Sequence, residues 1–457
     1  MRVLHAIHDF LPRHQAGSEI YCHTLCRALQ ERGTAVHVLA AEYDPAEAHG
    51  RLRWRVHDGV GVTEVINNWR FASFAESHSS PALGQRLAQV LDIVQPDVLH
   101  IHNLLNLSLD LPRLARGRGI PVVATLHDYT LVCPTGGQRV HVAEQHLCRE
   151  IDTARCARCF AGSHFGAQLR FGAVVGRPGG LLAARALGAV RRAWPGAFTT
   201  LGRAAAATGA TITAADIEQR LARARQVFDT VDCFVSPSPS LAAEFRALGL
   251  PEGKLEVLDY GFQPRAARAA RPPRGGRPLR IGFVGTLVWH KGAHVLLDAA
   301  RSLPAGSCEV LLFGDPAIFP DYTADLRRRA ARLPVEFRGG FARGDAAAVY
   351  DAIDVLVVPS LWLENSPLVI HEAFQAGVPV VGSRLGGTAD LLRDGVDGLL
   401  YEAFSADDLA AALARLIDEP GLLERLAAAA PPVRAIADDA RFWEERYAAL
   451  LGERRSA

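Results

Sequence analysis

Two carboxylates stand close together in the stretch Pro359–Glu372, which reads P-S-L-W-L-E-N-S-P-L-V-I-H-E. Glu364 lies in the loop after an apolar run, and Glu372 lies more than a turn into the helix that follows. Ionised carboxylates accept hydrogen bonds from hydroxyl groups, so the pair suits a sugar if both face one cleft. The alternative is that two acids near a helix N-terminus complement the helix dipole and nothing more.

The start of this helix also suits an anion. Ser366 and Pro367 predict the start, with the hydroxyl as N-cap and the proline at the first helical position. Because Pro367 has no N–H, the amides of Leu368 and Val369 are the free donors at the helix end. Such a helix end binds phosphate well, because its amides and its dipole both favour negative charge.

A lysine follows a strand and a glycine turn in Ile281–Gly292, which reads I-G-F-V-G-T-L-V-W-H-K-G. Lys291 at this helix entrance can neutralise a phosphate that the turn amides also approach, although a single lysine after a strand is usually a surface residue. Three further glycine turns follow neighbouring strands of the second half: Gly314-Asp315, Arg338–Gly340 and Ser383–Thr388. Together these turns predict a nucleoside diphosphate site in the second half of the chain.

Two features of the first half fall at strand ends. Gly17, in Q-A-G-S-E, follows the first strand and would let a ligand approach the backbone at a helix start. His127 follows the apolar run Val122–Leu126, which places an imidazole at the same edge of the sheet. The alternatives are an ordinary loop at Gly17 and a structural, hydrogen-bonded histidine at position 127.

The sequence carries a cysteine cluster in one loop-like stretch: Cys133, Cys148, Cys156 and Cys159. Four thiols, two of them in a C-x-x-C pair, have the number and local spacing that suit tetrahedral zinc. His141 and His146 are competing ligands, and a set of reduced loop thiols is the alternative. We expect a structural zinc ion at this cluster.

Short β-branched runs alternate with helical stretches along the whole chain. The runs are Val3–Ile7, Ala35–Ala40, Asp97–Ile101, Val122–Leu126, Cys233–Val235, Leu255–Leu258, Leu279–Val284, Glu309–Phe313, Val335–Phe337, Val355–Val358 and Val378–Val381. Strands spaced by helices predict parallel sheets, and there are enough strands for two doubly wound Rossmann-like domains. Ligands bind beyond the carboxyl ends of such strands, so two facing sheets predict one interdomain cleft.

The expected domain organisation follows from composition. A Pro-, Gly- and Arg-rich stretch at residues 266–278 is typical of a linker. It divides an N-terminal domain from a C-terminal nucleotide-binding domain. The expected ranges are 1–265 for the first domain, with a Cys-rich loop at 133–159 and a helical insertion at about 160–225, then 279–430 for the second, and 431–457 for a C-terminal helix that packs back on the first domain.

Charge and hydropathy exclude several classes of protein. The 50 basic and 49 acidic residues give a net charge of +1 and no electrostatic reason to expect nucleic acid. The first residues lack the apolar region of a signal peptide, and no run of about eighteen apolar residues predicts a membrane span. Eight cysteines in 457 residues do not indicate a disulfide scaffold, so we expect a cytoplasmic protein.

A basic amphipathic stretch, Leu181–Trp194, reads L-L-A-A-R-A-L-G-A-V-R-R-A-W. It would suit peripheral contact with an anionic membrane surface or a lipid-linked substrate. The alternative is a helical insertion with a solvated arginine face.

With these residues assembled, the chain resembles the family-4 glycosyltransferases, retaining sugar-nucleotide enzymes of the two-domain GT-B fold. The likeness covers nearly the whole chain and is least clear at residues 160–225. It is most specific from Val355 to Tyr401, through the E-x7-E pair, A-F-Q-A-G-V-P-V-V and R-D-G-V-D-G-L-L.

The resemblance implies roles for the residues of the second half. Glu372 would bind the ribose of the nucleotide, Glu364 would contact the donor sugar, and the amides of Leu368 and Val369 would contact the donor phosphate. Lys291 matches the family lysine that contacts the diphosphate.

Two positions depart from the family pattern. Thr286 stands where the family usually has an arginine, and Asp390 replaces a commoner glutamate. In the first half, Gly17 resembles the family's glycine loop, and His127 resembles the histidine that faces the transferred sugar.

The resemblance therefore implies transfer of a sugar from a nucleoside diphosphate donor to a hydroxyl of a glycan or lipid-linked acceptor, with retention. Lys291 and the helix-end amides would stabilise the departing diphosphate, and His127 would hold the sugar through a hydroxyl or its own carbonyl. No Asp-x-Asp pair ends a strand, so we expect no catalytic metal. The usual setting of the family is cell-surface polysaccharide or glycolipid synthesis.

Two other functions would use the same site. One is a nucleotide-sugar epimerase of the same fold, which needs no acceptor. The other is a non-catalytic nucleotide-sugar-binding protein, which the missing arginine at Thr286 favours and the retained Lys291, Glu364 and Glu372 oppose.

Overall fold

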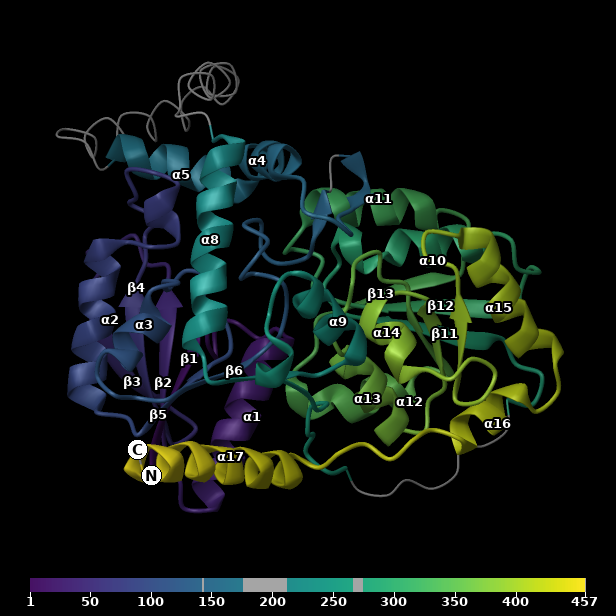
Figure 1. The fold of residues 1–457 in the computed structure, drawn as a ribbon. Coiled ribbons are helices and arrows are strands. Elements are labelled where there is room, and N and C mark those ends of the chain that lie inside the picture. Colours follow the sequence, from purple (N-terminus) through teal and green to yellow (C-terminus); the bar gives the residue numbers. More distant parts are fainter. Residues whose placement is uncertain (142–143, 176–211, 266–273, 457) are drawn as a thin grey trace.

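The structure is a computed structural model that describes residues 1–141, 144–175, 212–265 and 274–456. Two parallel-stranded sheets lie side by side, each flanked by helices (Figure 1). The predicted α/β architecture with two Rossmann-like sheets is confirmed.

The first sheet has eight strands in the order β10-β9-β6-β5-β1-β2-β4-β3. Its strands are β1 (Arg2–Ile7), β2 (Ala35–Glu42), β3 (Leu52–His57), β4 (Val60–Ile66), β5 (Val98–Ile101), β6 (Val122–Thr125), β9 (Cys233–Ser236) and β10 (Leu255–Val257). The central strands β5, β6 and β9 are buried at every position, as expected for parallel strands covered on both faces.

Helices of the first half connect these strands. They are α1 (Gly17–Glu31), α2 (Pro81–Val94), α3 (Leu111–Arg116), α4 (Thr153–Gly162), α5 (His164–Val175), α8 (Ala214–Thr230) and α9 (Pro239–Ala247), with short 3-10 turns η1 (Ala75–Ser77) and η3 (Glu252–Lys254). A small antiparallel hairpin of β7 (Val140–His141) and β8 (His146–Leu147) precedes α4.

The second sheet has six parallel strands in the order β13-β12-β11-β14-β15-β16. They are β11 (Leu279–Val284), β12 (Cys308–Phe313), β13 (Val335–Gly339), β14 (Val355–Val358), β15 (Val380–Ser383) and β16 (Gly398–Tyr401). The direction of winding reverses between β11 and β14, so the connections that follow these two strands continue on opposite faces of the sheet. Such a switch point is the usual ligand site of a doubly wound sheet.

The second half has its own helices and 3-10 turns. They are α10 (Ala293–Ala300), α11 (Pro320–Ala330), α12 (Ala346–Asp351), α13 (Leu368–Gln375), α14 (Gly386–Leu391), α15 (Ala406–Asp418) and α16 (Leu422–Ala428), with η4 (Trp289–Lys291) and η5 (Arg343–Asp345). Each half has its own apolar core, but Leu363 and Leu385 of the second half pack in the core of the first. The two domains are therefore in direct apolar contact.

The expectation of purely parallel sheets is wrong at one edge. β3 pairs antiparallel with β4, because the two strands are joined by the tight turn at Asp58-Gly59. Both turn residues have positive φ, 47° and 78°, which Asp and Gly tolerate best. This Asp-Gly pair was the available sequence signal for the hairpin.

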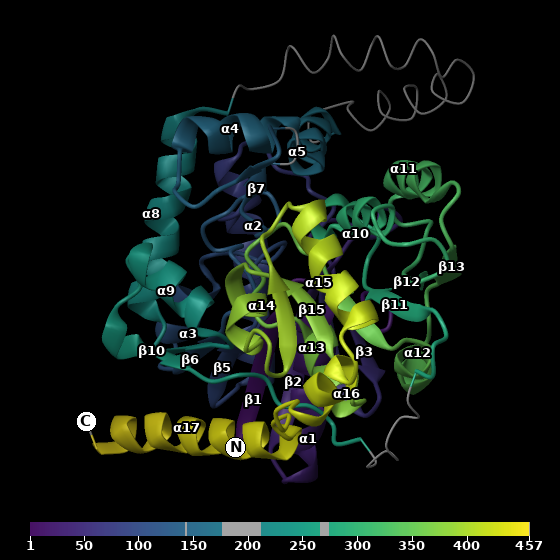
Figure 2. The same ribbon diagram turned by 90° about the vertical axis from the view of Figure 1, so that its right-hand side faces the viewer.

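The last helix, α17 (Ile436–Ser456), returns to the first domain and lies at the end opposite α4 and α5 (Figures 1 and 2). Trp443 and Tyr447 are buried there, and the Tyr447 hydroxyl lies 2.6 Å from His100 Nδ1. The chain thus crosses between the domains twice, and the two crossings pair where Phe262 exchanges backbone hydrogen bonds with Arg434 and Ile436.

Two expectations fall on parts of the chain outside the described residues. Most of the expected linker, residues 266–273, is one of them. The basic stretch Leu181–Trp194, within the insertion expected at about 160–225, is the other. The described ends of that insertion are the helices α5 and α8.

Candidate active site at the domain interface

The loops after β11 and β14 meet at the switch point of the second sheet. Lys291, at the end of η4, donates a hydrogen bond from Nζ to Glu364 Oε1 at 2.7 Å. Ser360 donates a second one to the same oxygen at 2.6 Å. A Cβ on Gly292 would lie 1.8 Å from the Pro359 carbonyl oxygen, so only glycine permits this approach of the two loops.

The ion pair is buried on one side and open on the other. The Glu364 side chain is 3% exposed, whereas that of Lys291 is 30% exposed. The Lys291 ammonium also lies 5.2 Å from the centre of the Trp362 ring. An ammonium has three donors, so Lys291 can hold Glu364 and still donate to a phosphate oxygen.

The predicted N-cap of α13 is wrong. The helix begins at Leu368, and its N-cap is Pro367, which has extended backbone angles. The Ser366 hydroxyl donates instead to Asp259 Oδ1 at 2.7 Å and lies 2.8 Å from His371 Nε2. Asp259 belongs to the segment after β10, so a partner distant in sequence outcompetes the local cap.

The first two amides of α13 remain available. Leu368 and Val369 occupy the first turn, and among the described residues neither amide has a backbone acceptor. The side chain of Leu368 lies against the start of α1, where a Cβ on Gly17 would be 3.3 Å from Leu368 Cδ1. Two of the predicted site residues, one from each domain, therefore meet at the two helix starts.

Glu372 has partners different from those of Glu364. It accepts a hydrogen bond from the Tyr350 hydroxyl at 2.7 Å, and an Arg265 nitrogen lies 3.9 Å from its other oxygen. The Arg265 guanidinium in turn lies over the Tyr350 ring. The Glu372 side chain is 24% exposed, so a carboxylate oxygen can still reach a ligand. Within the described residues the two glutamates share no hydrogen-bond partner.

Thr286 lies in the exposed turn after β11, where its carbonyl accepts a hydrogen bond from Val288 at 2.9 Å. A neutral hydroxyl thus stands at the position where the resemblance implies an arginine. Lys291 is the cation that the structure places beside Glu364.

His127 lies just beyond β6 and is buried. Its Nδ1 lies 2.7 Å from the Tyr260 hydroxyl, and its Nε2 lies 3.0 Å from His102 Nδ1. Burial, helped by the nearby His8, lowers the pKa of His127 to about 3, so the ring is neutral at pH 7. Both ring nitrogens are engaged within the protein.

The backbone carbonyl of His127 is the group that faces the second domain. It accepts a hydrogen bond from the side chain of Asn365, which also lies 3.3 Å from the Tyr260 hydroxyl. Asn365 stands between Glu364 and Ser366 in the loop before α13. The structure thus joins His127 directly to the stretch that carries Glu364.

Buried histidines extend behind His127, and sequence reasoning did not find them. His102 bonds both His127 and His5, each at 3.0 Å, and burial lowers the pKa of His102 well below its usual value. These residues come from the ends or interiors of β1, β5 and β6, which are neighbours in the sheet. The sequence does carry a signal for this cluster, because the three histidines stand at corresponding places in adjacent strands. That signal can be recognised only once the order of the strands in the sheet is known.

Acidic residues near His127 were also missed. Asp128 is partly buried and accepts hydrogen bonds from Asn103 at 2.8 Å and from the Thr130 amide at 2.7 Å. Burial raises the pKa of Asp128. Glu19, in the first turn of α1, is 2% exposed, and one of its oxygens lies 3.5 Å from His8 Nε2. Their positions beside His127 and Gly17 in the sequence were the available signal.

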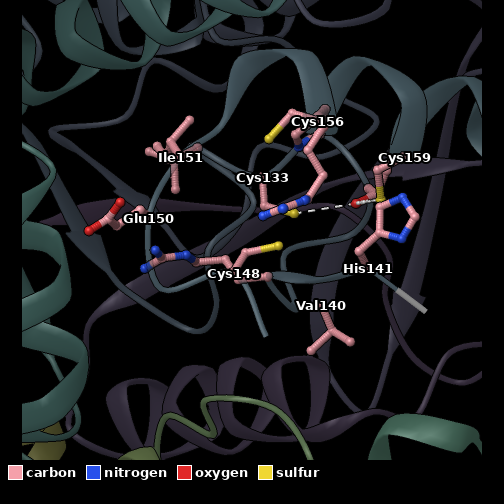
Figure 3. Close-up of a pocket in the computed structure, with 13 residues that line it drawn as sticks. Cys133, Val140, His141, Cys148, Glu150, Ile151, Cys156 and Cys159 are labelled. Carbon is pink, nitrogen blue, oxygen red and sulfur yellow. Dashed lines mark hydrogen bonds between the residues drawn. The ribbon is translucent and has the colours of Figure 1, made fainter. Parts of the chain in front are cut away.

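The four cysteines of the predicted zinc site line one cavity at the end of the first domain that carries α4 and α5 (Figure 3). His141 lines the same cavity, whereas His146 does not. Burial and the neighbouring thiols raise the pKa of Cys156 to about 12 and that of Cys159 to about 11. Arg139 also lines this cavity and pairs with Glu244 of α9, the helix whose Ser240 bonds Asp390 of the second domain.

The fold and the site together define a class of protein. Two doubly wound domains meet where the strand ends of one face those of the other, and a lysine, a carboxylate and a helix start converge at that contact. This is the GT-B arrangement of sugar-nucleotide enzymes.

Comparison with known proteins gives the family. Residues 16–169 match the family described as Glycosyltransferase Family 4, and residues 278–419 match the family described as Glycosyl transferases group 1. The chain belongs to the family-4 glycosyltransferases, as the sequence predicted.

Curated relatives are D-inositol 3-phosphate glycosyltransferases. The protein of Rhodococcus opacus (strain B4) is 35% identical over 205 residues, which cover 41% of this chain and 45% of the relative. That of Mycobacterium marinum is 30% identical over 253 residues, which cover 51% and 52%. The chain spans about half the length of the curated relatives it matches.

Solved structures share the fold over almost the whole chain. Anabaena HepE in complex with UDP-glucose has a TM-score of 0.62 at 18% identity, covering 99% of this chain and 100% of that one. Sucrose-phosphate synthase from Thermosynechococcus elongatus has a TM-score of 0.61 at 16% identity, covering 100% and 98%. The predicted GT-B fold is thereby confirmed.

Within the described part of the chain, no helix combines the length and the apolar character needed to cross a membrane.

Proposed function

We propose that this protein transfers a sugar from a nucleoside diphosphate sugar to an acceptor hydroxyl, with retention as the family resemblance implies. The observation that carries the proposal is the Lys291–Glu364 pair beside the open start of α13, at the switch point of the second sheet. A cation and unpaired amides at one strand edge suit a diphosphate.

The departing diphosphate gains negative charge as the sugar leaves. In this proposal Lys291 meets that charge with its partly exposed side chain, and the amides of Leu368 and Val369 donate from the helix start. Glu364 holds the ammonium in place through the 2.7 Å bond. Such preorganised donors act in place of a metal ion and need no rearrangement during the reaction.

Glu372 is proposed to bind the nucleotide ribose. Tyr350 and Arg265 fix its carboxylate while leaving it partly exposed. A carboxylate held in this way can accept hydrogen bonds from both ribose hydroxyls, and each such bond to a charged group stabilises a complex by about 1.5–3 kcal/mol.

The carbonyl of His127 is proposed to face the transferred sugar. Asn365 now donates to this carbonyl across the domain contact. A sugar hydroxyl can take the place of the Asn365 amide as donor, which requires the two domains to separate at this point. The neutral ring of His127, with both nitrogens engaged, would then act by positioning that carbonyl.

The acceptor is proposed to bind on the first domain, near Asp128 and Glu19. A glycan or lipid-linked acceptor in cell-surface polysaccharide or glycolipid synthesis fits the family, with peripheral membrane contact as a further proposal. A cytoplasmic setting is part of the proposal, because eight cysteines in 457 residues do not indicate a disulfide scaffold.

Glu372→Ala is expected to weaken nucleoside diphosphate binding about 10²- to 10⁴-fold, since it removes two charged hydrogen bonds to the ribose. Isothermal titration calorimetry with UDP, GDP and ADP measures this. Glu372→Gln keeps an acceptor for the Tyr350 hydroxyl and controls for local disorder. Glu419→Ala, at an exposed acid after α15, should leave binding unchanged. If Glu372→Ala binds the nucleoside diphosphates as tightly as the unaltered protein, Glu372 does not bind the ribose.

A further inference from the structure

We propose that Cys133, Cys148, Cys156 and Cys159 bind one Zn²⁺ ion and form a structural site in the first domain. All four line a single cavity, and their thiols project into it from three separate segments (Figure 3). This proposal stands on the first domain alone and does not depend on the sugar-transfer chemistry.

Local structure brings each thiol to the cavity. Cys133 closes a turn in which its amide donates to the Tyr129 carbonyl at 2.7 Å. Cys148 follows the β7–β8 hairpin, and its amide donates to the Arg139 carbonyl at 2.8 Å. A turn, a hairpin end and a helix are thus the three sources of ligands.

The C-x-x-C pair lies on α4. Cys156 and Cys159 are three residues apart in this helix, so their side chains share one face. Asp152 caps the helix by accepting a hydrogen bond from the Arg155 amide at 2.9 Å. The cap fixes the first turn and with it the direction of both thiols.

The four cysteines line the cavity, but no three of their sulfur atoms lie within 4.8 Å of one another. The Thr135 hydroxyl lies between two of them, 3.4 Å from Cys133 Sγ and 3.7 Å from Cys159 Sγ. Zinc binding would draw the four sulfurs to about 2.3 Å from a common centre. Four thiolates fill the tetrahedral positions of zinc, so no position is left for water and the site is structural.

A buried cation balances the charge of such a site. Zinc with four thiolates carries a net charge of about −2. Arg220 of α8 is buried, and its guanidinium donates to the carbonyls of Thr130 and Leu131. Among the described residues, the hydrogen bonds of the Arg220 guanidinium go to these two carbonyls and to no carboxylate.

Proximity supports this pairing of charges. The carbonyls that Arg220 binds, those of Thr130 and Leu131, precede Cys133 by three and two residues, which places the guanidinium near the cluster. A buried guanidinium without a counterion is costly, and thiolates held by zinc would supply that counterion. Arg139 and Arg155 also line the cavity.

The competing histidines are engaged elsewhere. His146 lies outside the cavity lining and bonds an Arg155 nitrogen at 2.8 Å. His141 lines the cavity, but its Nδ1 accepts from the Glu144 amide at 3.0 Å and its Nε2 lies 3.6 Å from the Glu144 carboxylate. The four thiols are therefore the favoured ligand set.

Zinc binding at the four cysteines is expected to hold the segment that follows His127 rigid beside the candidate active site. The segment from Tyr129 to Cys133 begins two residues after His127. Zinc would join that segment to the hairpin and to α4, in addition to the apolar packing of Tyr129 and Phe160 in the core of the first domain.

The test is elemental analysis of the full-length protein purified without chelator. We expect one zinc ion per chain, and we expect Cys156→Ser and Cys148→Ser each to lose it. Cys308→Ser, at a buried thiol of the second domain, is the matched control and should retain the zinc. His141→Ala should also retain it, and loss of the metal in that variant would overturn the all-cysteine ligand set.

Cobalt substitution keeps the test independent of variants that fail to fold. Exchange of Zn²⁺ for Co²⁺ in the unaltered protein should give thiolate-to-cobalt charge-transfer bands in the near ultraviolet and strong tetrahedral d–d bands. Protein without zinc that also takes up no Co²⁺, or that binds Co²⁺ without thiolate bands, would overturn the proposal.

Discussion

Lys291→Ala is expected to lower kcat/KM for sugar transfer by about 10²- to 10³-fold, because it removes a positive charge aimed at the departing diphosphate. The turn after β11 has a threonine, Thr286, where the family resemblance implies a second cation. The turn itself therefore offers no cation at that position, and the loss should fall mainly on kcat. Steady-state kinetics with the accepted donor measure the effect.

The same change also leaves Glu364 without a cationic partner. Glu364 is a buried carboxylate that Lys291 neutralises in the unaltered protein. An unpaired buried charge destabilises a protein by about 3–5 kcal/mol, which could reduce activity by itself. The double variant Lys291→Ala/Glu364→Gln separates the two effects. It should recover most of the lost Tm but little of the lost activity. Recovery of activity along with Tm would assign Lys291 a purely structural role.

Arg301→Ala is the matched surface control for Lys291. Its side chain is about half exposed and pairs with Asp298 in the same domain. Loss of this cation should leave kcat/KM unchanged. A comparable loss of activity in both variants would indicate a general effect of charge on the domain.

Gly387→Ala is expected to lower Tm by about 6 °C and to reduce transfer at least as strongly as Lys291→Ala. An added Cβ would lie 1.7 Å from the Asn365 carbonyl oxygen. The Gly387 amide also donates to the Glu364 carbonyl, so this contact positions the loop that holds Glu364. Relief of the clash must move that loop or the start of α14.

Gly84→Ala is the control for Gly387→Ala. Gly84 lies within α2, and nothing approaches within 4 Å of the position its Cβ would occupy. Alanine should stabilise this helix by up to about 1 kcal/mol without a change in activity. Differential scanning calorimetry and kinetics compare the two variants. A Gly387→Ala protein with normal Tm and normal turnover would contradict the role assigned to this turn.

The strand pattern predicted most of the fold because buried parallel strands are continuous apolar runs. Such runs can be recognised locally, as Val355–Val358 illustrates. The edge strand β3 alternates charged and apolar residues and pairs through a turn, so the search for buried runs missed it. β4 and β16 were also missed, because β4 contains the polar pair Thr63-Glu64 and β16 is a four-residue strand that begins with glycine.

Site residues were predictable where the chemistry is local and not where partners come from distant segments. Gly17, Lys291 and Glu364 could be singled out from a turn, a strand end or a spacing. The bond between Lys291 and Glu364 could not, because its partners are 73 residues apart. Ser366 was assigned as a cap for the same reason: its partner Asp259 lies 107 residues away.

The most direct test of the central claim is mass spectrometry of the purified protein with UDP-, GDP- and ADP-sugars and a panel of acceptors. The panel should include D-inositol 3-phosphate, simple glycosides and extracted lipid-linked glycans. We expect one donor to yield its nucleoside diphosphate and a glycosylated acceptor, with the anomeric configuration of the donor retained by NMR. Inversion at C2 of free donor without an acceptor would show an epimerase, and binding without turnover would show a non-catalytic protein; either result would contradict the account.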